Sequence, residues 1–161
     1  MAEILFKLIE VSIWSGLAAV GFGILFNIPK STIFTVFALA FFAGLIKFTL
    51  IHFEVNIIIA TFLGILFVSF VGMPIAHKIH HPPVVFCIPP AIPMIPGYFA
   101  YETILAIMNF LFIEEDPLKK AELISDIFSN GLTMVFILIS IAIGISLPLL
   151  LLRKNTVKKI E

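Results

Sequence analysis

Long uncharged apolar stretches dominate this chain and constrain its fold more than any other sequence feature. A helix needs about 20 apolar residues to cross the roughly 30 Å of hydrocarbon in a bilayer. Five stretches meet or approach that length: residues 8–26, 32–51, 55–75, 83–113 and 130–152. Only 12% of the 161 residues are charged, against about 25% in a typical soluble chain. The sequence therefore predicts an all-α integral membrane protein with five transmembrane helices. It excludes a soluble enzyme, a nucleic-acid-binding protein and a disordered chain.

A polar segment separates the last two spans. Within it, apolar residues recur at helical spacing over residues 117–128, which predicts a short amphipathic helix on the membrane surface. We expect the first span to be retained rather than cleaved as a signal peptide, because Glu3 and Glu10 flank Lys7 before it. The single cysteine, Cys87, excludes an internal disulfide. One transmembrane domain over residues 1–161 is the expected organisation.

The distribution of basic residues predicts the orientation. Five spans place the two termini on opposite sides of the membrane. With the N-terminus outside, the cytoplasmic side carries Lys30, Lys78, Arg153, Lys154, Lys158 and Lys159, and the outer side carries Lys7, Lys47, Lys119 and Lys120. Because cytoplasmic loops carry the excess of Lys and Arg, we expect an N-out, C-in topology.

The fourth span carries an unusual concentration of proline. Six of the ten prolines lie between Pro82 and Gly97, and the residues around them are strongly apolar. Proline removes a backbone donor and disrupts the preceding turn, so the fourth helix is predicted to break within Pro89–Gly97, near the bilayer centre. Broken backbone at that depth is tolerated where it is buried in protein or lines a cavity. A proline-kinked helix packed for shape alone is the alternative.

The break has a chemical consequence. A second helix starting near Tyr98 would point its unpaired amides at the membrane interior, where they would favour an anion. Gly97 would permit a positive φ at this restart. Discontinuous helices at the midplane mark substrate sites in secondary transporters.

Two sequence stretches carry a family resemblance. AVGFGILFNIP (residues 19–29) and AIPMIPGYFAY (residues 91–101) resemble the signature stretches of the threonine/serine exporter family, and the order of the motifs and the number of spans agree. The chain is similar to the family's short five-span subunit, which corresponds to the C-terminal half of the longer fused exporters. Positions that match the pattern are Phe22, Phe26, Asn27, Pro29, Pro93, Pro96, Gly97 and Tyr101.

The resemblance implies an exporter of small carboxylate metabolites in the bacterial inner membrane. Threonine and serine, or succinate-like dicarboxylates in two-subunit members, are the implied substrates, and a larger five-span subunit is the implied partner. The residues point the same way, because the chain has an odd number of spans and no internal repeat, so an inverted mate would be another chain. Candidate substrate-binding residues are Asn27, Pro93, Pro96, Gly97, Tyr98 and Tyr101.

Glu102 and Lys47 are charged residues within or near apolar spans. Glu102 follows Gly97 by five residues and is a candidate carrier of a coupling proton; a structural hydrogen bond to another helix is the alternative. Lys47 lies near the end of the second span, and we expect it to snorkel to the headgroups. A contact with a substrate carboxylate is its alternative role.

A run of histidines supplies a rival function. His77 with His80 or His81 has the spacing that places two metal ligands on one helix face. A cation or metal transport component is therefore one alternative, although a polar cap at the membrane interface is the preferred interpretation. A membrane scaffold without transport activity is the other alternative. No phosphate loop, nucleotide motif or catalytic motif appears, so we expect neither a cofactor nor enzymatic activity.

Small residues recur at intervals of four in several spans. They are Ser15, Ala19 and Gly23, and the pairs Ala40 and Gly44, Ala60 and Gly64, and Ser140 and Gly144. Such stripes let helix backbones approach closely, so we expect them to mark helix–helix contacts.

Overall fold

The computed structural model describes residues 2–151, and the described chain is helical throughout. Its elements are α1 (Ala2–Leu25), η1 (Lys30–Thr32), α2 (Ile33–His52), α3 (Ile57–Lys78), α4 (Val84–Ala91), η2 (Ile92–Met94), α5 (Gly97–Phe112) and α6 (Pro117–Leu151). Four helices are long and apolar enough to cross a membrane, or up to five if one bent pair forms a single span. The predicted all-α membrane fold is thus confirmed. The last predicted span ends at Leu152, which lies outside the described residues, as do Arg153, Lys154, Lys158 and Lys159.

Three helices end on a left-handed residue that is not glycine. Asn27, Glu54 and His80 have φ values of 54°, 60° and 56°. The turn after α1 shows the pattern: Ile28 N–H donates to Gly23 O at 3.1 Å and Asn27 N–H donates to Ile24 O at 3.0 Å. These two bonds form a Schellman motif, which satisfies carbonyls at a helix end and reverses the chain. Short loops of this kind keep consecutive helices adjacent.

The fourth predicted span is broken as the proline cluster indicated. The segments Val84–Met94 and Gly97–Phe112 are bent by 47° at the break. Pro89 and Pro90 lie inside α4, and Pro96 immediately precedes α5. Proline cannot donate to the carbonyl four residues earlier, so the helical bonding that would continue α4 into α5 is lost in this segment.

The prediction of a separate surface helix over residues 117–128 was wrong. These residues form the first part of α6, which continues without a break to Leu151. Near Asn130 the composition of α6 changes from polar to apolar, which is typical of a helix that passes from water into lipid. No proline or left-handed residue interrupts the helical backbone there. At 1.5 Å per residue, the 35 residues of α6 are about 52 Å long.

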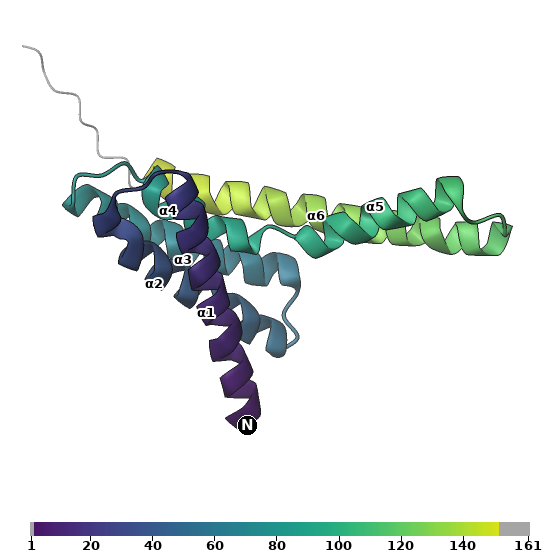
Figure 1. Cartoon of the computed structure of the whole chain (residues 1–161), viewed down its shortest axis with the longest axis horizontal. Coiled ribbons are helices and arrows are strands. Elements are labelled where there is room, and N and C mark those ends of the chain that lie inside the picture. Colours follow the sequence, from purple (N-terminus) through teal and green to yellow (C-terminus); the bar gives the residue numbers. More distant parts are fainter. Residues whose placement is uncertain (1, 152–161) are drawn as a thin grey trace, which may run out of the picture.

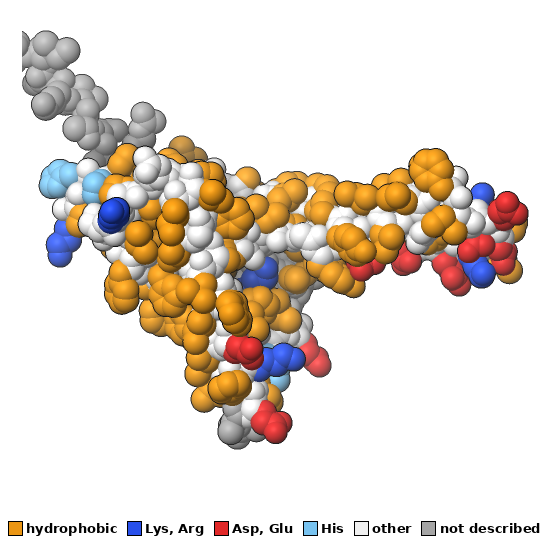
Figure 2. All heavy atoms as spheres, in the orientation of Figure 1, with side chains coloured by type: hydrophobic (Ala, Val, Ile, Leu, Met, Phe, Trp, Pro, Cys, Tyr) orange, Lys and Arg blue, Asp and Glu red, His pale blue; other side chains and the backbone are white. Residues whose placement is uncertain are grey.

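The helices form a bundle with a projecting arm (Figure 1). Helices α1 to α4 pack together, and the C-terminal part of α6 lies against α3. Helix α5 packs mainly along α6, and these two antiparallel segments extend away from the bundle. In Figure 2, acidic and basic side chains gather at the tip of this arm, whereas apolar side chains cover most of the visible surface. That distribution suits a chain surrounded by lipid.

The core lies around the break. Buried Met94 of η2 packs in one cluster with residues of α2, α3, α4 and α6: Ala43, Ile65, Val68, Ala91, Ile137 and Ile141. The small-residue stripes occupy the close helix contacts, as predicted. A methyl group added at Gly44 would lie 3.0 Å from Ser15 Oγ, and one at Gly64 would lie 3.1 Å from Ala43 O. The break is therefore anchored in a tightly packed bundle.

Candidate functional site at the helix break

The break places buried and exposed backbone side by side. Met94 is 3% exposed, whereas Ile95, the next residue, is 50% exposed. Ile95 N–H donates to Ile92 O at 3.0 Å and Gly97 N–H donates to Ile95 O at 2.9 Å, so two tight turns connect η2 to α5. Helix α5 then begins without a side-chain cap. The amides of Tyr98 and Phe99, which follow Gly97 in the first turn of α5, are available to an outside acceptor, in keeping with the predicted anion preference.

Lys47 is buried beside this break. Its side chain is only 8% exposed, and its Nζ donates to Met94 O at 3.5 Å. Nζ also lies 5.8 Å from the centre of the adjacent Phe48 ring. The expectation that Lys47 snorkels to the headgroups was wrong, because the carbonyl at the break lies within its reach and packed helices cover its stem. The structure thus adds a cation to the site.

The sequence did indicate that Lys47 is buried, but its place near the end of α2 suggested an interfacial lysine instead. A lysine five residues before the end of a helix is usually counted as interfacial. However, Gly44 precedes it by three residues and Ala43 by four, and both are fully packed against other helices. In a helix, residues three and four apart share a face, so the small-residue stripe already indicated that Lys47 points into the bundle.

The candidate substrate residues of the fourth span surround an open face. Pro96 is buried and Pro93 is half-buried, whereas Tyr98 and Tyr101 are 68% and 63% exposed. Gly97 is also exposed, and a Cβ added there would meet no heavy atom within 4 Å. The structure therefore places these residues at the start of α5, where the described chain leaves Gly97, Tyr98 and Tyr101 uncovered but buries Pro96.

The prediction that Gly97 permits a positive φ was wrong. No described glycine has a positive φ, and Gly97 is the first residue of α5. The preceding residue Pro96, at φ −80° and ψ 62°, turns the chain instead. Backbone strain consequently gives no reason for glycine at this position.

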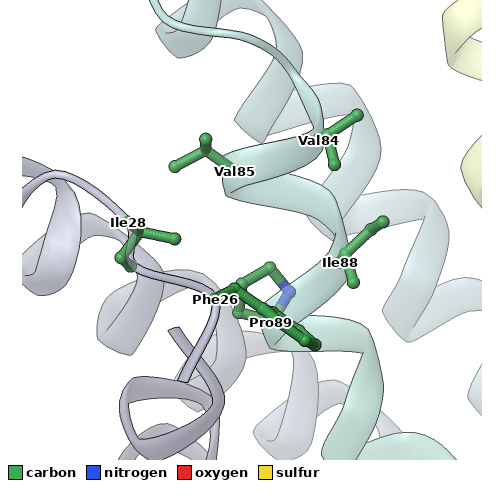
Figure 3. A pocket seen from close by; sticks show the side chains of 6 residues that line it. All are labelled: Phe26, Ile28, Val84, Val85, Ile88 and Pro89. Atoms are coloured by element: carbon green, nitrogen blue, oxygen red, sulfur yellow. The ribbon is translucent and has the colours of Figure 1, made fainter. Parts of the chain in front are cut away.

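Asn27 belongs to the first signature stretch, where α1 ends close to α4. Its left-handed backbone terminates α1 before Pro29. Next to it, an apolar cavity of about 250 Å³ separates the end of α1 from α4 (Figure 3). Phe26 and Ile28 line it from one side, and Val84, Val85, Ile88 and Pro89 line it from the other. The first signature stretch thus packs against the broken span, although the side chains around this cavity offer no charge to a carboxylate.

Glu102 lies in the second turn of α5 and is partly exposed. Within residues 2–151, no hydrogen bond or ion pair joins its carboxylate to another side chain; the ion pair found there is Lys119–Glu114, at 3.7 Å. A structural bond between Glu102 and another helix of this chain is therefore not formed.

The histidine run does not keep the helical spacing on which the alternative metal site depends. Helix α3 ends at Lys78, so His77 is helical, whereas His80 has left-handed backbone and His81 follows it. The turn separates the side chains that a continuous helix would align. In the part of the chain described, no three His, Cys, Asp or Glu residues gather as a metal site would require.

Comparisons with known proteins give a consistent result. The family model of the threonine/serine exporter ThrE matches residues 11–151. An uncharacterized protein of Haemophilus influenzae is 29% identical over 145 residues, which cover 90% of this chain and 48% of that protein. The chain therefore spans about half the length of this curated relative. No solved structure matches the chain.

Proposed function

Because the chain belongs to the threonine/serine exporter family, we propose that it is one half of a secondary transporter that exports small carboxylate-bearing metabolites. Threonine and serine, or succinate-like dicarboxylates, are the proposed substrates, and the bacterial inner membrane is the proposed location. The observation that carries this proposal is the broken α4–η2–α5 span, whose turn lies between a buried cation and an exposed helix N-terminus.

We propose that the substrate binds at the start of α5. Pro93, Pro96 and Gly97 shape the turn, and Tyr98 and Tyr101 present aromatic rings with hydroxyl groups beside it. Asn27 is the proposed contact from α1, supported by the packing of α1 against α4 and η2. Unpaired amides at a helix N-terminus favour a negatively charged group. Glu102, one turn further along α5, is the proposed proton carrier.

A larger five-span subunit is the proposed partner. Two observations support it: the chain spans 48% of its relative, and the candidate substrate residues Gly97, Tyr98 and Tyr101 are exposed. In transporters built from inverted repeats, the substrate site lies between two halves. The other half would close the open face of α5.

Reconstitution tests the proposal. The tagged chain is purified from native membranes, and proteoliposomes are prepared with and without the larger membrane protein that copurifies. We expect export of labelled threonine, serine or succinate from the two-subunit vesicles and none from vesicles that hold this chain alone. Full transport by the single chain would contradict the two-subunit proposal and would favour a homo-oligomer.

A further inference from the structure

Lys47 lacks the partners that a buried ammonium group requires. The group carries three N–H donors, and its described contact is a single long bond of 3.5 Å to Met94 O. No acidic side chain of residues 2–151 pairs with it. Buried charges are ordinarily paired, because an isolated charge in an apolar interior is very costly. The bundle therefore holds a cation with unused donor capacity at the break.

A second buried polar group near Lys47 also lacks a partner. Thr61 on α3 is fully buried, and its Oγ1 forms no hydrogen bond. Five other helical hydroxyl groups donate to a carbonyl of their own helix: Ser12, Ser15, Thr103, Thr133 and Ser140. Thr61 makes no such bond although it is fully buried, which leaves its hydroxyl free for another group.

The packing of α2 against α3 brings these two groups to the same level. A Cβ on Gly64 would lie 3.1 Å from Ala43 O and 3.0 Å from Met94 Cε. Lys47 follows Ala43 by one turn, and Thr61 precedes Gly64 by about one turn. Because α2 and α3 are antiparallel neighbours joined by a short loop, one turn along each leads to the same height. Lys47 and Thr61 thus lie at about the same height on neighbouring helices, and Lys47 reaches Met94 O at the break.

We infer that Lys47 is the anion anchor of the transport site, and that its ammonium group receives the carboxylate of the exported metabolite. The inference rests on the proposed function and names a residue for it. A carboxylate accepts charge-assisted hydrogen bonds from the unused ammonium donors. The hydroxyl of Thr61 donates to the same carboxylate, which we infer enters beside the exposed residues Ile95 and Gly97 at the turn that begins α5.

The test compares carboxylates with their amides in vesicles that contain this chain and its partner. Labelled threonine is transported, and unlabelled L-threonine or L-threoninamide competes with it. The two competitors differ in the group that Lys47 is inferred to bind. A charge-assisted pair predicts that the wild-type complex prefers threonine over threoninamide by at least about tenfold.

Substitutions at Lys47 should remove this preference. In Lys47→Met and Lys47→Gln we expect threonine and threoninamide to compete about equally, because the charge is lost while much of the volume is kept. Lys47→Met removes a buried charge and should leave the melting temperature unchanged or raised. Lys47→Gln retains a polar donor toward Met94 O. Comparison of the two variants therefore distinguishes the effect of losing the charge from the effect of losing a structural hydrogen bond.

Two matched controls sharpen the comparison. Ser69 is the other buried hydroxyl of α3; it lies two turns beyond Thr61, next to the Cys87 side chain. Thr61→Val should reduce the preference for the carboxylate, whereas Ser69→Ala should preserve it. Lys78 is an exposed lysine at the end of α3, so Lys78→Met should also preserve it.

The outcomes are distinguishable. A wild-type complex that transports threonine, together with Lys47 variants that keep the tenfold preference, would overturn this inference alone. If the Lys47 variants bind threonine and threoninamide more weakly by the same factor, the inference would also be overturned, because a structural role of Lys47 would affect both ligands equally. A wild-type complex that transports none of threonine, serine and succinate would overturn the proposed function and this inference together.

Discussion

Glycine residues occupy two different kinds of position in this chain. Gly144 on α6 lies against α3, where an added methyl group would come within 2.8 Å of Cγ2 of the fully buried Ile65. Gly97, by contrast, has open space around it. Glycine is thus needed for close helix contact at Gly144, whereas packing within this chain does not require it at the break.

Gly144→Ala should destabilise the protein, by about 1–3 kcal/mol, because Ile65 must shift in a packed core. Gly21→Ala is the matched control, since nothing lies within 4 Å of that position. It should raise stability by up to about 1 kcal/mol through helix propensity. Thermal unfolding in detergent measures both, and equal melting temperatures for the two variants would refute the argument.

Glu102→Gln tests the coupling role. The substitution keeps the size of the side chain and its hydrogen bonding but removes the titratable proton. If Glu102 carries the coupling proton, export driven by a pH gradient should be lost, while exchange down a substrate gradient partly survives. Efflux of labelled substrate from two-subunit vesicles, with and without an imposed pH gradient, measures this.

Glu122→Gln is the control for that experiment, because Glu122 is an exposed residue in the first turns of α6. It should leave the gradient dependence unchanged. Unaltered gradient dependence in Glu102→Gln as well would remove Glu102 from the mechanism.

At the scale of the helices, the sequence was most informative where a residue restricts the backbone dihedral angles or removes a backbone hydrogen bond. The break predicted within Pro89–Gly97 is present, and α1 ends at Leu25, one residue from the predicted end of the first span. The junction near Asn130 was misjudged, because a change in polarity was taken for a change in backbone. Lys47 was misjudged for a related reason. Because it lies near the end of its helix, its ammonium group was expected to reach the headgroups, but Lys47 shares a helix face with Gly44, and that face is buried.

Replacing the prolines of the break should straighten the α4–α5 pair. Alanine at positions 93 and 96 restores two amide donors, and each interior proline disfavours a helix by about 3 kcal/mol relative to alanine. We expect the double variant Pro93→Ala, Pro96→Ala to remain in the membrane and to lose transport. Spin labels at the exposed positions 84 and 112 should move apart as the 47° bend decreases.

Pro74→Ala provides the control, since Pro74 lies inside α3 and is exposed. It should leave both the label distance and transport unchanged. A double variant with an unchanged label distance would show that packing of Met94, rather than proline, holds the bend.

For the whole molecule, the burial of Lys47 bears on orientation. A lysine enclosed by helices does not belong in a count of loop charges. Without it, the outer side keeps Lys7, Lys119 and Lys120 against six basic residues on the cytoplasmic side. The predicted N-out, C-in topology therefore rests on a larger bias than the sequence alone suggested.

Cysteine labelling in intact cells tests this topology. On a Cys87→Ser background, a cysteine at position 115 should react with an impermeant reagent, and one at position 158 should react only after permeabilisation. Position 115 lies in the turn between α5 and α6, and position 158 lies outside the described residues. Labelling of 158 but not of 115 would reverse the orientation.

The length of α6 couples this protein to the thickness of its bilayer. The part of α6 without charged residues runs from Ile127 to Leu151 and measures about 37 Å, more than the roughly 30 Å of a typical hydrocarbon layer. Such a helix tilts, or the bilayer thickens around it. Helix α5 packs mainly along α6, whereas α4 packs on α1, α2 and α3. A change in the tilt of α6 is therefore expected to move α5 relative to α4, so that lipid chain length adjusts the angle between the two arms of the broken span.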